Sequence, residues 1–260
     1  MNISDELLRG QIALGALELA RLSGVIALSP VPWQHAPARA RVGLLVFLLV
    51  LVHGHGDSPV REMTSASWVA ANTFTELVIG ACIGMFVRLC IAAAEIMGEA
   101  IAPTIGFSAA QIFDPSTGST DSVLTNLIRT LALLIAVTTG LHRVMLTALI
   151  SSFQLLPVGT ALHVEASFPL YLELSGHMLG VGVRLALPVL AVLLMVNVGL
   201  GFVARAAPTM QIFNVGFAVL LGVGAAVLYV TLPDFSHVLA AEMGRAGGYF
   251  ERVIHELGGR

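Results

Sequence analysis

The sequence predicts an all-α, polytopic membrane protein, and three observations support that class. Of its 260 residues, 57% are hydrophobic and only 11% are charged, whereas a soluble domain carries roughly 25% charged residues. The mean hydropathy is +0.89. Several apolar runs approach or exceed the roughly 20 residues that a helix needs to cross a membrane. Together these features exclude a water-facing globular surface.

The first two apolar segments are separated by a proline-rich turn. Residues 12–28 form the first segment, and the acidic N-terminus before it lacks the basic region of a cleaved signal peptide, so we expect this segment to be retained. The turn at residues 29–37 contains three prolines. The second segment, residues 42–52, is near the lower length limit for a span.

The middle of the chain carries two longer segments. Residues 74–97 can cross a membrane, and they continue into a weakly amphipathic stretch at residues 99–105. Residues 124–156 are too many for one straight span. We therefore expect this fourth segment to tilt, kink or extend beyond the bilayer.

Two further segments complete a predicted set of about six. Residues 178–203 form the fifth, with Pro188 inside it, and residues 212–232 form the sixth. Residues 233–260 are expected to be a soluble tail, and residues 1–260 to form a single domain. With six crossings, both termini lie on one side of the membrane, together with five arginines, and three arginines lie on the other side. This difference favours cytoplasmic termini.

Residues 106–121, between the third and fourth segments, form a polar island. They are rich in Gly, Ser and Thr, carry Asp114 and Asp121, and contain no cation. The amides of such backbone would have no partners in lipid. The polar island must therefore lie in water, in a cavity or against protein, and an external loop is one interpretation of it.

Eight charged residues lie inside the apolar segments or their extensions. They are Glu18, Arg21, Arg88, Glu95, Glu99, Arg129, Arg143 and Arg184. Such a charge needs a partner or water and is a functional hypothesis by default, although an arginine near a membrane surface can simply extend its head group into water. The excess of arginine over acid in the later segments favours an assembly of several subunits.

Helical spacing predicts how some of these charges are arranged. Glu18 and Arg21, three residues apart, can pair on one helix face. Arg88, Glu95 and Glu99 align along another face, as spacings of seven and four require. Arg129 and Arg143, fourteen residues apart, are expected to share a face too.

Small residues predict close helix contacts at two places. Gly80 and Gly84 form a GxxxG pair, and Gly176, Gly180 and Gly182 form a second strip. Without bulky side chains, two helix backbones can approach closely along such faces.

No motif predicts an enzyme or a cofactor site. Ser108 could act as a nucleophile with a histidine as base, but it lacks the context of a nucleophile elbow. Glu95 and Glu99 could ligate a metal, yet no histidine stands at a helical spacing beside them. Phosphate-loop and dinucleotide motifs are missing from the sequence, and no basic stripe suggests nucleic acid.

Several stretches in combination resemble one known family. They are residues 84–89 (GMFVRL) with 95–99 (EIMGE), residues 106–115 (GFSAAQIFDP), residues 152–159 (SFQLLPVG) and residues 205–217 (RAAPTMQIFNVGF). Together they resemble the FliR/SctT family of type III secretion export-gate subunits, and the resemblance covers essentially the whole chain.

The resemblance implies a non-enzymatic, structural subunit without cofactors, located in the bacterial inner membrane at the flagellar basal body. In the flagellar branch of that family, FliP, FliQ and FliR build a helical assembly around a pore. Unfolded flagellar proteins cross this pore, and FlhA and FlhB supply its cytoplasmic entrance.

The same resemblance implies that the polar island plugs the closed pore. The residues that it assigns to the plug are Gly106, Phe107, Ile112, Phe113, Asp114, Pro115 and Gly118. Pro115 fixes the turn after Asp114, and the hydroxyl-rich backbone can satisfy its own amides and rearrange at little cost. Gln111 and Ile112 depart from the family pattern, in which smaller residues are expected.

Two alternatives remain at this point. An injectisome subunit of the SctT type shares the family, and a stand-alone secondary transporter could use Arg88, Glu95 and Glu99 to line a substrate path. The transporter would be favoured by inverted repeats, and none is visible in the sequence.

Overall fold

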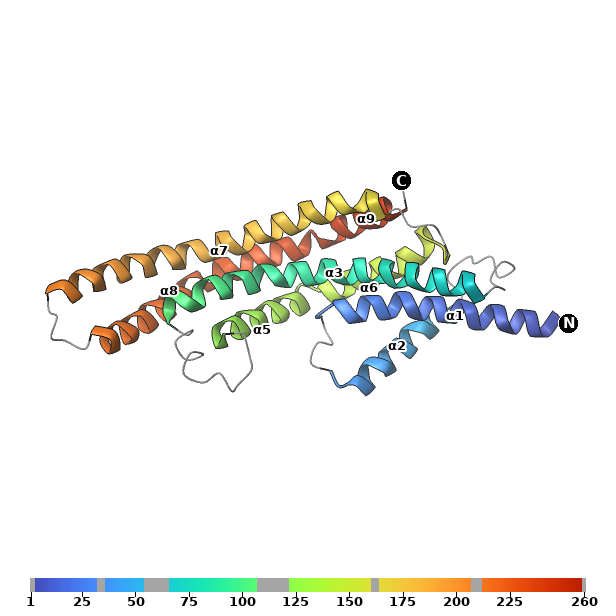
Figure 1. Ribbon diagram of the computed structural model, residues 1–260, viewed down its shortest axis with the longest axis horizontal. Helices are drawn as coiled ribbons and strands as arrows, with labels where there is room; N and C mark the ends of the chain where they lie inside the picture. Colours follow the sequence, from blue (N-terminus) through green and yellow to red (C-terminus); the bar gives the residue numbers. More distant parts are fainter. Residues whose placement is uncertain are drawn as a thin grey trace. The chain divides into compact units, whose positions relative to one another are not determined.

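The computed structural model describes residues 3–31, 36–53, 66–106, 122–159, 164–206 and 212–258 (Figure 1). In these residues every regular element is a helix, which confirms the predicted all-α class. The helices are α1 (Ile3–Leu28), α2 (Ala38–Val52), α3 (Ala66–Ile105), α5 (Val123–Thr138), α6 (Leu141–Leu155), α7 (Val164–Ala206), α8 (Ile212–Gly244) and α9 (Ala246–Leu257).

Each predicted apolar segment lies on a helix, but not every helix is a span. Four stretches in the described part of the chain are long and apolar enough to cross a membrane, or five if α5 and α6 together make one broken span. Helix α2, with 15 residues, is shorter than a span requires. The expected six spans are therefore an approximation.

Helix α3 is longer than its apolar core predicts. Its 40 residues join the third apolar segment to the amphipathic stretch after it, with Pro103 in the last turn. Gly106 ends the helix at a φ of 97°, a conformation that favours glycine, and its N–H donates to the Pro103 carbonyl over 3.2 Å.

The fourth apolar segment is broken, as its length suggested. Helix α5 ends at Thr138 and α6 begins at Leu141, after Gly140 with a φ of 78°. Two threonines followed by a glycine have low helix propensity, which places the break at this point rather than elsewhere in the segment.

The chain divides into two compact units. Unit 1 comprises Met1–Leu89, Ala136–Leu174 and Met243–Arg260, and unit 2 comprises Cys90–Ile135 and Ser175–Glu242. Helices α3, α5, α7 and α8 contribute residues to both units, so the boundaries between the units fall within helices and not at linkers.

The end of the chain, from Met243 onward, belongs to unit 1. Residues 233–258 are almost wholly helical, and α9 buries Phe250, Val253, Ile254 and Leu257 on one face. The Phe250 ring packs edge-on against the Phe86 ring of α3, with centroids 4.7 Å apart. Helix α9 is thus amphipathic, because its apolar residues recur at helical spacing.

Unit 2 is built from the C-terminal half of α3, α5 and the paired lengths of α7 and α8. Helices α7 and α8 run side by side in opposite directions (Figure 1). Glycines let α3 approach two of its neighbours closely. A Cβ on Gly182 of α7 would lie 2.5 Å from the Ala93 carbonyl oxygen of α3, and a Cβ on Gly98 of α3 would lie 2.8 Å from the Thr125 Cα of α5.

Candidate functional site

An ion pair between α1 and α3 lies at the centre of unit 1. The Arg21 Nε donates to a Glu76 carboxylate oxygen over 2.6 Å, and both side chains are completely buried. A buried charge of either sign is stable only when it is paired and hydrogen-bonded. This pair therefore requires α1 and α3 to pack together.

Arg21 also binds the C-terminal end of α6. Its terminal nitrogens donate to the Ser152 carbonyl over 2.9 Å and to the Leu156 carbonyl over 3.0 Å. The guanidinium carbon lies 4.3 Å from the centre of the Phe153 ring. A cation at this position meets backbone carbonyls, the negative end of the helix dipole and an aromatic face at once.

Glu76 uses its second oxygen to hold the turn after α6. That oxygen accepts a hydrogen bond from the Gly159 N–H over 3.0 Å. Gly159 has a φ of 87°, and a Cβ there would lie 2.7 Å from the Trp68 ring. One carboxylate thus links α1, α3 and the turn, and the motif at residues 152–159 is where this network ends.

The contact between α1 and α3 is made through glycine, as the GxxxG pair predicted. A Cβ on Gly80 would collide with the Arg21 backbone carbonyl, and one on Gly84 would lie 2.7 Å from the Val25 carbonyl oxygen. Gly24 of α1 makes the reciprocal approach to the backbone of α3. The second predicted strip is confirmed only at Gly182, because Gly176 and Gly180 have nothing within 4 Å of a Cβ.

Glu18 and Arg21 do not form the pair that their spacing predicted. Glu18 instead accepts from His53 at the end of α2, over 2.9 Å, and its side chain is almost completely buried. Arg21 turns to Glu76 and to the end of α6, where it satisfies more donors than a single neighbour on its own helix could. Tertiary partners have replaced the local one.

Unit 2 contains a second ion pair between helices. Arg129 of α5 donates to Glu95 of α3 over 2.6 Å and to the Asn126 side chain over 3.3 Å. The predicted row on α3 is not a uniform polar face, because Glu95 is half-buried and paired whereas Arg88 and Glu99 are exposed.

Other predicted charges are not brought together. Arg129 and Arg143 lie on α5 and α6, on opposite sides of the break at Gly140, so they share no continuous helix face. Within the described residues, Arg88, Glu99, Arg143 and Arg184 are exposed and have no ion pair with another described side chain.

Of the predicted plug residues, the structure describes only Gly106. A Cβ on Gly106 would lie 2.9 Å from the Phe217 ring of α8. Phe107, Ile112, Phe113, Asp114, Pro115 and Gly118 lie outside the described residues. Ser108 and His163, considered for nucleophilic chemistry, lie outside them as well.

Sequence reasoning missed Glu76, the most deeply buried acid of unit 1. A signal was available, since Glu76 lies inside the third apolar segment and no cation stands near it in the sequence. Its partner Arg21 is 55 residues away, so helical spacing could not connect them.

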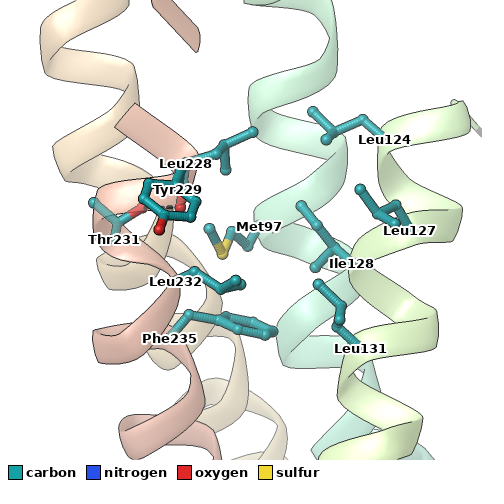
Figure 2. A pocket seen from close by; sticks show the side chains of 10 residues that line it. All are labelled: Met97, Leu124, Leu127, Ile128, Leu131, Leu228, Tyr229, Thr231, Leu232 and Phe235. Atoms are coloured by element: carbon teal, nitrogen blue, oxygen red, sulfur yellow. Dashed lines mark hydrogen bonds between the residues drawn. The ribbon is translucent and has the colours of Figure 1, made fainter. Parts of the chain in front are cut away.

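An apolar cavity of about 180 Å³ lies in unit 2 between α3, α5 and α8 (Figure 2). Ten residues line it: Met97, Leu124, Leu127, Ile128, Leu131, Leu228, Tyr229, Thr231, Leu232 and Phe235. The Thr231 hydroxyl donates to the carbonyl of Val227 in its own helix, over 3.0 Å. Apart from Tyr229 and Thr231 the lining is apolar, so the cavity presents no charged side chain.

The chain is similar in sequence to proteins of known families. Residues 12–246 match the family described as bacterial export proteins, family 1. The chain is also 30% identical to the flagellar biosynthetic protein FliR of Bacillus subtilis over 202 residues, which are 76% of this chain and 78% of that protein. This chain belongs to the FliR family.

Two further FliR proteins agree with this assignment. The FliR of Escherichia coli K12 is 30% identical over 83% of this chain and 82% of its own length. The FliR of Pectobacterium carotovorum is 30% identical over 82% of each chain. The family match over residues 12–246 covers Arg21, Glu76 and the 152–159 turn, and so the whole Arg21–Glu76 network.

Proposed function

We propose that this chain is a non-enzymatic, structural subunit of the flagellar type III protein export gate. With FliP and FliQ it forms the pore through which unfolded flagellar proteins leave the cell, and FlhA and FlhB form the entrance to that pore. Its place is the inner membrane at the flagellar basal body. The coarser statement, that the chain is a membrane-bound component of the flagellar export apparatus, follows from the FliR family itself.

The observation that carries the proposal is the family match over residues 12–246. The surface of the chain supports it. Only 33% of the most apolar window of residues 167–206 is buried, and only 11% of that of residues 215–257. Such helices need cover from lipid or from other subunits, because contiguous exposed apolar surface marks an interaction site.

The polar island at residues 106–121 is proposed as the plug of this pore. Its composition supports the role, since Gly, Ser and Thr supply amides and hydroxyls that can satisfy one another inside an aqueous channel. Gly106, with its left-handed backbone, is the residue at which the chain leaves α3 to enter this segment.

The flagellar branch is preferred to the injectisome branch. The curated relatives that match carry flagellar names in eight bacteria or strains. The stand-alone transporter has no such support, and its row of Arg88, Glu95 and Glu99 is split between exposed and paired environments.

The plug is tested by replacing residues 107–121 with a Gly/Ser linker of equal length in cells that express the whole assembly. We expect ion leak across the membrane, or loss of flagellar protein export, because the linker cannot seat in the closed pore. The wild-type chain expressed at the same level is the control. Normal ion tightness together with normal motility would contradict the plug assignment.

A further inference from the structure

A polar cavity of about 400 Å³ lies between α7 and α8 in unit 2. Four ionisable side chains line it, namely His177 and Arg184 of α7 and Asp234 and Glu242 of α8. Apolar side chains such as Leu185 and Val238 complete its wall. The cavity therefore has positively charged, negatively charged and apolar side chains in one wall. The apolar cavity described above lacks the charged side chains.

The four ionisable side chains are engaged to different extents. His177 and Glu242 hydrogen-bond to each other across the two helices over 3.1 Å. Arg184 and Asp234 are exposed, and neither forms an ion pair with a side chain in the described residues. A cation and an anion at the mouth of one cavity are thus available to a ligand that carries both charges.

The position of the cavity along the helices indicates its depth in a membrane. Residues 185–204 of α7, between Arg184 and Arg205, contain no charged side chain, and neither do residues 212–233 of α8, just before Asp234. At 1.5 Å per residue, 20 residues span about 30 Å, which is the thickness of the hydrocarbon core. Arg184 and Asp234 then lie where the hydrocarbon ends and lipid head groups begin.

From this charge complementarity we propose that the cavity binds the head group of a phospholipid that carries a phosphate and a primary ammonium, such as phosphatidylethanolamine. The Arg184 guanidinium donates to the phosphate oxygens, and the Asp234 carboxylate accepts from the ammonium. The acyl chains follow the apolar surfaces of α7 and α8, where Leu187, Leu194 and Val230 are 54%, 65% and 72% exposed.

The size of the cavity favours a head group over a protein segment. Phosphoethanolamine has eight non-hydrogen atoms, which need about 240 Å³ if each takes the ~30 Å³ of a water molecule. A single turn of an α-helix with its side chains already occupies roughly 400–600 Å³, given a diameter of 10–12 Å and a pitch of 5.4 Å. A partner helix would cover the cavity from outside but could not enter it.

The test measures phospholipid retained by the purified full-length chain, by native mass spectrometry after exchange into detergent with phosphatidylethanolamine, phosphatidylcholine or phosphatidylglycerol. We expect the wild type to retain phosphatidylethanolamine best. Arg184→Gln should lower retention of all three about tenfold or more, the effect of losing one charge-assisted hydrogen bond. Asp234→Asn should lower phosphatidylethanolamine alone, because the other two head groups offer no primary ammonium.

Arg205→Gln is the matched control, since it removes the same charge from the other end of the uncharged run. It should leave the lipid preference unchanged. Arg184→Lys, which keeps the cation, should retain phosphatidylethanolamine and serves if the glutamine variant fails to fold. The proposal is overturned if Arg184→Gln retains as much lipid as the wild type, as Arg205→Gln should, or if Arg184→Lys loses the lipid. It is also overturned if phosphatidylcholine is retained equally well.

This measurement needs neither FliP nor FliQ. Its result is therefore independent of the export-gate proposal, and either one can fail without the other.

Discussion

Arg21 is the residue on which most of unit 1 depends. It satisfies one carboxylate, two carbonyls of α6 and one aromatic ring, while no part of its side chain reaches solvent. Such a residue is costly to bury and costly to leave unpaired. Its partners come from α3 and from the C-terminal end of α6, so Arg21 depends on the correct packing of both against α1.

Glu76→Gln is predicted to destabilise the protein by about 3–5 kcal/mol, because it leaves the Arg21 charge buried without a counter-ion. The double variant Arg21→Met with Glu76→Leu should lose less stability than the sum of the losses in Arg21→Met alone and Glu76→Leu alone, because no charge is then left uncompensated. Unfolding of the full chain in mixed detergent micelles measures this. Strict additivity of the two changes would show that the buried pair is not coupled.

The partners of individual charged residues were the feature that the sequence predicted least well. It identified Arg21, Glu95 and Arg129 as charges that need partners, but spacing along one helix could only suggest local ones. The actual partners of Arg21 lie 55 to 135 residues away. Pairing at that distance depends on tertiary packing, which no single-helix periodicity contains.

At the scale of elements, glycine sets how closely the helices pack. The GxxxG pair on α3 could be read from the sequence because the motif has a direct packing meaning. For Gly176 and Gly180, the sequence could not show whether a helix packs closely against them, because spacing alone does not say whether another backbone lies opposite. The break after α5 was foreseen from length, and Gly140 determines where it falls.

Gly80→Ala is predicted to destabilise the chain by about 1–3 kcal/mol, because the added methyl group collides with the backbone of α1 at Arg21. Gly15→Ala, in α1 of the same unit, is the matched control. Nothing lies within 4 Å of a Cβ at Gly15, so this change should be neutral or stabilise the helix by about 0.5–1 kcal/mol. Equal effects of both changes on the unfolding midpoint would argue against close α1–α3 packing.

At the scale of the whole molecule, composition was sufficient to predict an all-α membrane protein, and motif combinations were sufficient to predict its family. The division into two units and the packing of the C-terminal helix α9 against α3 were not predicted. Both depend on contacts between distant segments, and a polar C-terminal stretch with amphipathic spacing can serve equally as a tail or as a packed helix.

The central claim is that this chain works as one subunit of a larger gate. The most direct test is co-purification of the tagged full-length chain from membranes that also contain the FliP and FliQ of the same bacterium. We predict a stable complex of all three proteins, because the uncovered apolar surfaces of α7 and α8 need partners. Recovery of the chain alone, with solute uptake when it is reconstituted in liposomes without FliP or FliQ, would contradict the account and support a stand-alone transporter.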